Sequence, residues 1–183
     1  MNREAVFMHI PKTGGLSIRR MCKNNNIKVI RHDSRDPRNV SLAEYRRRNP
    51  NIFSFAVVRN PWDRLVSVYY FLRSGGIRPE DKQDADRFVN KYKNFNEFVL
   101  NAFQNDDILK QIHFRPQYLW ISDNNKLIVD ELGRFESLQS SVSDILEKMR
   151  KELNTTIIMA SHDQRTYERA QRTLKLDRGV LSE

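Results

Sequence analysis

Apolar and polar positions alternate along this chain with two different periods. Short apolar runs that end in turn residues predict buried strands, whereas apolar residues that recur every three or four positions predict helices. Strands that alternate with helices predict an α/β fold of three layers, in which a mostly parallel central sheet is flanked by helices. The predicted strands cover residues 5–10, 27–30, 53–58, 127–129 and 155–160, with a further short strand at 134–135. The predicted helices cover residues 17–24, 41–48, 62–73, 94–103, 137–153 and 163–174.

The segments between these elements contain no repeat, no low-complexity tract and no domain linker. The 183 residues are therefore expected to form one domain over 1–183. Residues 31–40 are polar and predict a loop. Residues 74–86 combine two glycines, a proline and many charged side chains, which predicts a mobile excursion that could act as a lid over a substrate.

Positive charge exceeds negative charge in this sequence. The chain has 32 lysines and arginines against 23 acidic residues, so its formal net charge is +9. An excess of this size favours an anionic partner. Hydrophobic residues make up 39% of the chain, which is enough for a core.

The sequence also bears on compartment and on metal binding. Cys22 is the one cysteine, so no intrachain disulfide can form, and its polar neighbours predict an inert thiol. No apolar stretch is long enough to span a membrane, and no apolar signal region precedes the first strand. We therefore expect a cytoplasmic protein without a membrane span. The histidines and the cysteine lack metal-ligand spacing, so no metal site is expected.

A loop of small and polar residues follows the first predicted strand. It contains Lys12, Thr13 and the adjacent glycines Gly14 and Gly15, and Ser17 opens the predicted helix. Glycines let the backbone approach a phosphate, and the free N–H groups at a helix start point towards it. Here the lysine precedes the glycines, whereas the nucleotide-triphosphate loop has Gly-Lys-Ser/Thr after four spacer residues. The order predicts a phosphate-bearing donor other than ATP.

A second strand, loop and helix repeat this arrangement. The apolar run 53–58 ends at Arg59, Pro61 suits the first turn of a helix, and Ser67 lies about two turns into that helix. Arg59 and Ser67 would reach one anion near the carboxyl ends of the strands, where open α/β sheets bind ligands. An ion pair between Arg59 and Asp63 is the alternative.

The segments HIPKTGGLS and FAVVRNPWDRLVSVYY resemble the sulfotransferase superfamily, and more closely the branch of carbohydrate sulfotransferases and heparan-sulfate 2-O-sulfotransferase. A weaker third likeness is HFRPQ at 113–117 followed by GRFESL at 133–138, so the resemblance covers roughly residues 5–140. It implies a P-loop-like fold and transfer of a sulfuryl group from 3′-phosphoadenosine 5′-phosphosulfate (PAPS) to a hydroxyl of a carbohydrate. The nucleotide product would be adenosine 3′,5′-bisphosphate (PAP), and no metal would be required.

The resemblance implies roles for individual residues. Lys12 would be catalytic, because a cation near the leaving phosphate stabilises the charge that develops there. The family usually has threonine where this chain has Leu16, which removes a hydroxyl but leaves the backbone cradle. The residues implied for the 5′-phosphosulfate are Pro11, Lys12, Thr13, Gly14, Gly15 and Ser17. Those implied for the 3′-phosphate are Arg59 and Ser67.

The acceptor hydroxyl also needs a general base, and the histidines are the first candidates. His32 ranks first. It follows the second predicted strand, and the stretch that separates it from the second motif is similar to the segment that bears the base in the family. His113, in the third motif, ranks second. His9, at the end of a buried strand, is expected to be structural, and His162 lies outside the resemblance. Glu44 is a further candidate, but its position suits a capping box.

Several polar residues have two interpretations each. Ser17 could bind the phosphate, cap its helix, or do both. The basic run 46–48 could contact an acidic acceptor or form a solvated face. Arg134 and Glu136 match a family pattern, with an internal ion pair as the alternative.

Two other functions remain open from the sequence. A P-loop kinase would need the Gly-Lys order, which is absent, and an acidic magnesium ligand after a strand, for which Asp130 is the candidate. A non-catalytic protein that binds glycan or nucleic acid through its basic surface would bind no donor, and its affinity would fall steeply with salt. We expect an anionic nucleotide donor and a carbohydrate acceptor, and no nucleic acid partner. The sequence does not identify the acceptor, the position sulfated or the oligomeric state.

Overall fold

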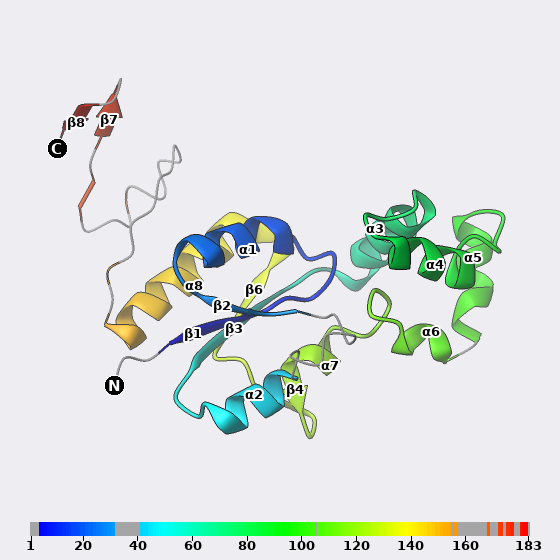
Figure 1. Ribbon diagram of the computed structural model, residues 1–183, viewed down its shortest axis with the longest axis horizontal. Helices are drawn as coiled ribbons and strands as arrows, with labels where there is room; N and C mark the ends of the chain where they lie inside the picture. The colour runs from blue at the N-terminus through cyan, green and yellow to red at the C-terminus, as the bar shows by residue number, and fades with distance from the viewer. Residues whose placement is uncertain are drawn as a thin grey trace.

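Four parallel strands form the central sheet of the computed structural model (Figure 1). All three pairings between neighbouring strands are parallel, so the carboxyl ends of the four strands meet at one edge. The strands β1 (Ala5–Met8), β2 (Lys28–Ile30), β3 (Phe53–Val58) and β6 (Glu131–Arg134) lie in the order β2-β1-β3-β6. The structure describes residues 4–31, 41–104, 106–154, 156, 168, 172–173, 175–177 and 180–182.

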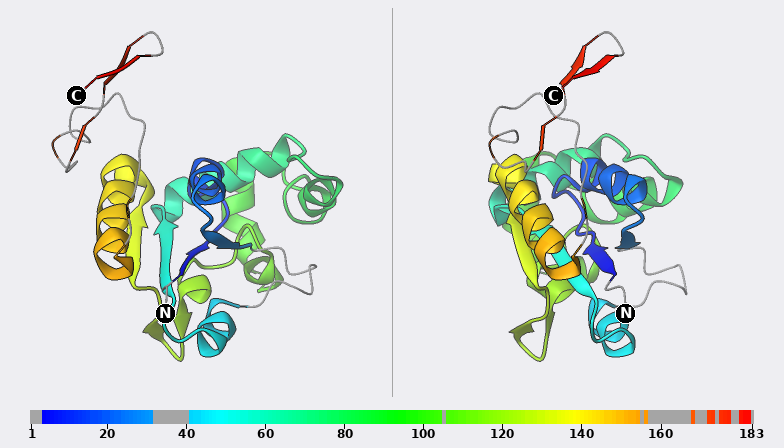
Figure 2. Two further views of the ribbon diagram at one scale, coloured as in Figure 1. Left: turned by 60° about the vertical axis from the view of Figure 1, so that its left-hand side comes forward. Right: turned by 90° about the vertical axis from the view of Figure 1, so that its left-hand side faces the viewer.

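Helices cover both faces of this sheet, as Figures 1 and 2 show. Helices α1 (Gly15–Asn24) and α8 (Leu138–Leu153) pack on one face, against Phe7, Phe55 and Val57. Side chains alternate across a strand, so Val6 and Ala56 point to the other face. There they pack with residues of α2 (Leu42–Arg48) and α7 (Tyr118–Ile121). The predicted three-layer α/β fold with a parallel sheet is confirmed.

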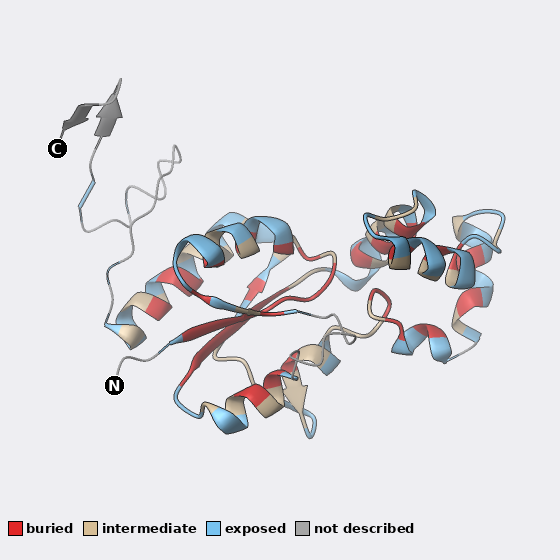
Figure 3. Ribbon diagram, in the orientation of Figure 1, coloured by how far each residue is buried: buried red, intermediate tan, exposed pale blue. Residues whose placement is uncertain are grey.

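A lobe of helices lies beside the carboxyl edge of the sheet (Figure 1). Its core is aromatic: Phe98 is fully buried and contacts the rings of Tyr69 and Phe114. Figure 3 shows buried residues along the helices of this lobe. The lobe comprises α3 (Pro61–Arg73), α4 (Pro79–Phe88), α5 (Phe95–Asn101), the 3₁₀ helix η1 (Ala102–Gln104) and α6 (Asp107–Lys110). The remaining elements are the antiparallel pairs β4 (Ser122–Asp123) with β5 (Lys126–Leu127) and β7 (Lys175–Asp177) with β8 (Val180–Ser182), and the 3₁₀ helix η2 (Phe135–Ser137).

Several elements differ from the sequence prediction. Helix α1 begins at Gly15 rather than at Ser17, because Gly14 takes a left-handed conformation and starts the helix two residues earlier. Much of the expected loop at 74–86 is helix α4, whose first turn is fixed by Asp81, which accepts hydrogen bonds from the N–H groups of residues 77 and 78. Whether this segment moves as a lid remains a prediction. The strand expected at 127–129 extends only to Leu127, as β5. The strand expected at 134–135 is β6, which ends at Arg134. The expected strand at 155–160 and helix at 163–174 lie almost entirely outside the described residues.

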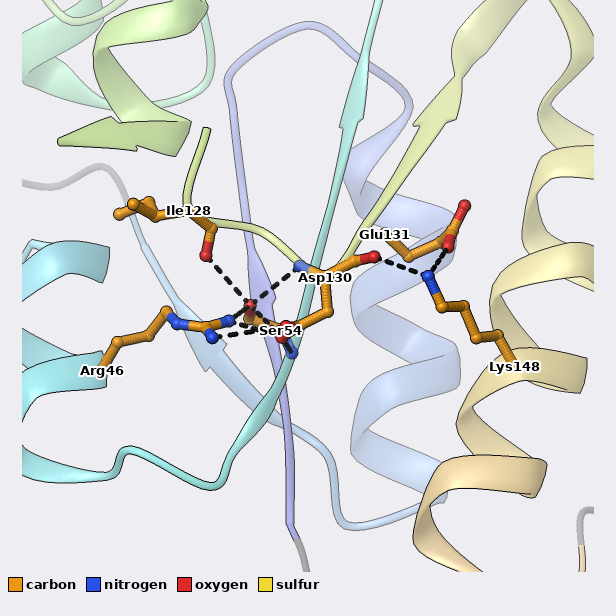
Figure 4. A network of polar contacts seen from close by, with 6 residues as sticks. All are labelled: Arg46, Ser54, Ile128, Asp130, Glu131 and Lys148. Carbon is orange, nitrogen blue, oxygen red and sulfur yellow. Dashed lines mark hydrogen bonds and ion pairs between the residues drawn. The ribbon is translucent and has the colours of Figure 1, made fainter. Parts of the chain in front are cut away.

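A polar network holds the amino end of the sheet together (Figure 4). The carboxylate of Asp130, just before β6, accepts hydrogen bonds from the backbone N–H of Ser54 at 2.8 Å and from its hydroxyl at 2.7 Å. Arg46 of α2 forms an ion pair with the same carboxylate. Lys148 of α8 donates to the carbonyl of Asp130 at 2.8 Å and to the carboxylate of Glu131 at 2.7 Å. This network joins β3 and β6 to the helices on both faces.

We predict that Asp130→Asn destabilises the fold by about 2 kcal/mol, the usual cost of losing hydrogen bonds to a charged group. The melting temperature should fall by roughly 4–8 °C for a chain of this size. Calorimetric unfolding measures both quantities. Asp123→Asn is the matched control, because its ion pair with Arg47 is exposed, and it should leave the melting temperature nearly unchanged. An equal shift in both variants would contradict the assigned role of Asp130.

The same carboxylate gives stability a dependence on acid. Burial raises the pKa of Asp130, but hydrogen bonds from Arg46 and Ser54 outweigh burial and hold the pKa below its ordinary value. The carboxylate is therefore stabilised by folding. Its contribution is fully present above about pH 4, the pKa of an unfolded aspartate. It is lost as the pH falls through the lower pKa of the folded state.

Candidate functional site

The loop between β1 and α1 forms a cradle at the carboxyl edge of the sheet. Thr13 is fully buried, and its hydroxyl donates to the carbonyl of Ile10 at 2.9 Å, which closes the turn. Gly14 is the N-cap of α1, with φ of 78°, and it has no side chain to cap the helix. The first N–H groups of a helix have no partner within the helix. The start of α1 is therefore suited to an anion.

The two glycines are required by their neighbours. A Cβ atom on Gly15 would lie 1.9 Å from Nε2 of His9. A Cβ atom on Gly14 would lie 3.0 Å from the ring of Phe135, and the positive φ of Gly14 is itself unfavourable for other residues. His9 is buried against Gly15, in agreement with the structural role expected from its place at the end of the first strand.

Lys12 projects from this loop towards the helical lobe. Its ammonium group lies 4.1 Å from the centre of the Phe71 ring, on α3. Burial, followed by repulsion from Arg59, lowers the pKa of Lys12 from its ordinary 10.5, while Asp81 acts in the opposite direction. The loop thus places a partly buried cation between the sheet and the lobe.

Arg59 follows β3 and is held in place before any ligand binds. Its guanidinium stacks on Phe135 at 4.4 Å. Its Nε atom is buried and has no hydrogen-bond partner among the described residues. The side chain of Gln117 fixes its backbone from both sides, accepting from the N–H at 2.9 Å and donating to the carbonyl at 2.7 Å. The alternative ion pair with Asp63 is not formed within the described part of the chain. A buried, unpartnered guanidinium nitrogen is suited to a phosphate.

Ser67 and Ser17 occupy different positions relative to the loop. Arg64, Ser67 and Phe71 are spaced three and four residues apart, so they share one face of α3. Arg64 contacts the carbonyl of Pro11 and Phe71 contacts the ammonium group of Lys12, so this face is turned to the loop. Ser17 is exposed in the first turn of α1, whose N-cap is Gly14. Ser17 therefore does not cap the helix.

The third motif, at 113–117 and 133–138, contacts the segment that follows β3, an arrangement that the sequence did not predict. Besides Gln117, it supplies Phe135 beneath Arg59 and Glu136, whose carboxylate accepts from the N–H of Asn60 at the start of α3. The internal ion pair that was the alternative for Arg134 and Glu136 is not formed among the described residues. The motif was visible in the sequence, but nothing there indicated its partners.

His113 is enclosed by protein groups. Gln111 accepts from the N–H of His113 at 2.7 Å and from that of Phe114 at 3.2 Å, which fixes its amide. Its NH₂ group therefore donates to Asp84 at 2.9 Å and faces Nδ1 of His113 at 3.0 Å. The remaining ring nitrogen, Nε2, lies 4.0 Å from Asp81. His113 is only 4% exposed. Both ring nitrogens thus face protein groups, an arrangement that suits structural support better than proton abstraction.

The other candidate residues lie elsewhere. His32 and His162 are outside the described residues. The N–H of Glu44 donates to Ser41, and its carboxylate pairs with Arg48, so Glu44 belongs to the cap and surface of α2. Each arginine of the run 46–48 has a partner, at Asp130, Asp123 and Glu44 respectively. Asp130 lies at the amino end of the sheet, opposite the loop, where a magnesium ligand for a bound nucleotide would not be placed.

Some further observations concern the rest of the described chain. Burial raises the pKa of the Cys22 thiol to about 12, as expected of an inert cysteine. No group of three or more histidine, cysteine or acidic side chains there is arranged to hold a metal ion. Within the same residues, no helix is both long enough and apolar enough to span a membrane.

Comparison with known proteins gives one family and one relative. A sequence model described as "Sulfotransferase family" matches residues 2–179. An uncharacterized protein of Archaeoglobus fulgidus is 30% identical over 111 residues, which cover 60% of this chain and 78% of that protein. No solved structure matches the chain.

Proposed function

This chain belongs to the sulfotransferase family, and we propose that it transfers a sulfuryl group from PAPS to a hydroxyl of a carbohydrate acceptor. Family membership supports sulfuryl transfer as the class of reaction. The observation that carries the donor assignment is Arg59, whose buried Nε lacks a partner and whose backbone is clamped beside the start of α3. It stands at the same edge of the sheet as the loop of Lys12.

The residues present fit the two phosphate-bearing ends of PAPS. The uncapped start of α1 and the ammonium group of Lys12 would hold the 5′-phosphosulfate. Arg59 and Ser67 would hold the 3′-phosphate. Gly14 and Gly15 leave room for the backbone to approach, and the hydroxyl of Thr13 holds the loop closed from within. The bound donor supplies the sulfuryl group and a phosphate leaving group.

The residues of the chain would act on charge and on position. In sulfuryl transfer the bond from sulfur to the bridging oxygen breaks while a bond from sulfur to the acceptor oxygen forms. Lys12 would stabilise the negative charge that develops on the leaving phosphate. The N–H groups of α1 would hold the same phosphate in position.

The acceptor proton needs a base, and we assign it to His32. The chain leaves β2 at Arg31, one residue before His32, and β2 ends at the same edge of the sheet as β1, where the N–H of His9 donates to the carbonyl of Ile30. His113 would instead support the lobe, because Gln111 and Asp81 face its ring nitrogens. His32→Ala should therefore reduce transfer while leaving PAP binding intact.

A carbohydrate acceptor is supported by the resemblance to carbohydrate sulfotransferases and by the net charge of +9, which favours acidic glycans. The kinase alternative is weakened by the position of Asp130 at the opposite end of the sheet. Binding of a polyanion without catalysis remains an outcome of the experiment below.

Calorimetric titration of PAP into the protein, with EDTA present, tests the donor assignment. PAP is expected to bind with a defined stoichiometry. In a separate assay, the protein should release PAP from PAPS when heparan sulfate, chondroitin or dextran is added. Dextran separates a general carbohydrate acceptor from an acidic one. A wild-type protein that binds heparan sulfate in a salt-dependent way but does not bind PAP would overturn the assignment in favour of polyanion binding.

A further inference from the structure

Lys12 has a backbone conformation that is unusual for a residue other than glycine. Its φ is 66°, in the left-handed region that non-glycine residues seldom adopt. This conformation is unfavourable for a residue with a Cβ atom, and it persists only where its surroundings hold it. Two anchors flank Lys12: the hydroxyl of Thr13 binds the carbonyl of Ile10, and Arg64 binds the carbonyl of Pro11.

Arg64 is a buried cation that is held by backbone carbonyls. It is 6% exposed. Its Nε donates to the carbonyl of Pro11 at 2.9 Å, Nη2 to that of His113 at 2.8 Å and Nη1 to that of Arg115 at 3.2 Å. Burial lowers the pKa of this guanidinium to about 10, so it remains charged at neutral pH. Burying a charge is costly unless hydrogen bonds satisfy it, and here the bonds join two segments that are distant in sequence.

We propose that Arg64 is a positioning residue, which fixes the carbonyl of Pro11 and thereby holds Lys12 in the left-handed conformation that directs its ammonium group to the donor. This inference rests on the proposed function, since it takes Lys12 as the catalytic lysine. The peptide that joins Pro11 to Lys12 is planar, so fixing its carbonyl also fixes the direction of the Lys12 N–H. The same guanidinium ties the loop to residues 113–115 of the third motif.

Geometry explains why an arginine is needed at this position. Its planar fork presents five donors in fixed directions, and three of them meet carbonyl oxygens of two segments. A lysine would keep the charge, but as a single point with three donors on one atom. Arg64→Lys should therefore keep the lobe in place and lose the fixed orientation of the loop.

The test compares Arg64→Lys with Arg73→Lys. Arg73 lies on the same helix and also donates to carbonyls, at Tyr92 and Asn90, but it is exposed and far along the helix from the loop. The rate of PAP release from PAPS with the best acceptor of the screen should fall roughly 10- to 100-fold in Arg64→Lys, because small misplacements of a catalytic group have effects of this size. The KM for PAPS should change by less than threefold. Arg73→Lys should behave as wild type.

Hydrogen exchange of the backbone gives a measurement that does not need activity. In Arg64→Lys the N–H groups of residues 12–14 should exchange faster than in wild type, while those of β1 should be unchanged. Unaltered exchange in the loop would overturn the inference. So would a loss of transfer rate in Arg64→Lys that is fully explained by a smaller fraction of folded protein. Arg64→Met leaves three carbonyls unpaired; if it folds, it should show a larger effect than Arg64→Lys, and a smaller one would contradict the proposal.

The two proposals fail in distinguishable ways. If the wild-type protein does not bind PAP, the proposed function fails. Exchange in residues 12–14 then still reports whether Arg64 holds the loop. If the wild type binds PAP and releases it from PAPS, while Arg64→Lys shows normal rate and normal exchange, the function stands and the positioning role of Arg64 is wrong.

Discussion

Arg59→Ala should weaken PAP binding by roughly 100-fold, about the loss expected when several charge-assisted hydrogen bonds to a phosphate are removed. The guanidinium is already oriented by the ring of Phe135, and its buried Nε has no protein partner among the described residues. A bound 3′-phosphate would therefore satisfy a group that is otherwise buried without a hydrogen bond. Calorimetric titration with PAP, at fixed ionic strength, measures the effect.

Two companion variants sharpen this prediction. Arg59→Lys keeps the charge but loses the planar fork, so it should recover only part of the affinity. Arg48→Ala removes the same charge from the exposed pair with Glu44 on α2, and it should leave PAP affinity unchanged. If Arg48→Ala weakened binding as much as Arg59→Ala, affinity would depend on total charge, and Arg59 would not be a specific ligand.

Lys12→Ala should reduce the rate of sulfuryl transfer roughly 100- to 1,000-fold, the range seen when one preorganised group that stabilises developing charge is removed. PAP affinity should fall much less, because the charge that Lys12 stabilises develops mainly as the bond to sulfur breaks. Single-turnover release of PAP from PAPS measures the rate, and titration with PAP measures the affinity. Equal losses in rate and affinity would assign Lys12 to binding alone.

The pH profile provides a second test of Lys12. Burial and Arg59 lower its pKa below 10.5, and in the proposed mechanism the charged form is the active one. Activity should therefore decline as the pH rises through this lowered pKa, earlier than for an ordinary lysine. Lys12→Arg, which stays protonated throughout, should be slower at neutral pH but should lack this decline. An identical alkaline decline in both proteins would exclude Lys12 as its source.

The parallel sheet and the placement of the loops of Lys12 and Arg59 at one edge could be predicted because their signals are local. The apolar runs at 5–10 and 53–58 end at Lys12 and Arg59 within a few residues, so sheet topology alone brings both cations to one edge. Helix α1 begins at Gly15, two residues before the predicted start at Ser17, because the left-handed Gly14 is its N-cap.

The roles of the third motif could not be predicted, because they depend on partners about 50 to 80 residues away. Arg64 meets the carbonyls of Pro11 and His113, and Gln117 meets the backbone of Arg59. Hydrogen bonds to backbone carbonyls carry no sequence signature at the accepting residue. His113 is a candidate base by its place in the third motif, but in the fold the side chain of Gln111 faces its Nδ1.

The carboxamide of Gln117 has the same donor and acceptor as a peptide group, and it pairs with Arg59 just where the sheet ends. One side chain thus pairs with Arg59 as a neighbouring strand would. A backbone that is already fixed loses less conformational entropy when a ligand binds to Arg59 than a frayed strand end would. We therefore expect substitutions at position 117 to change donor affinity, although this residue is not among the proposed ligands of the nucleotide.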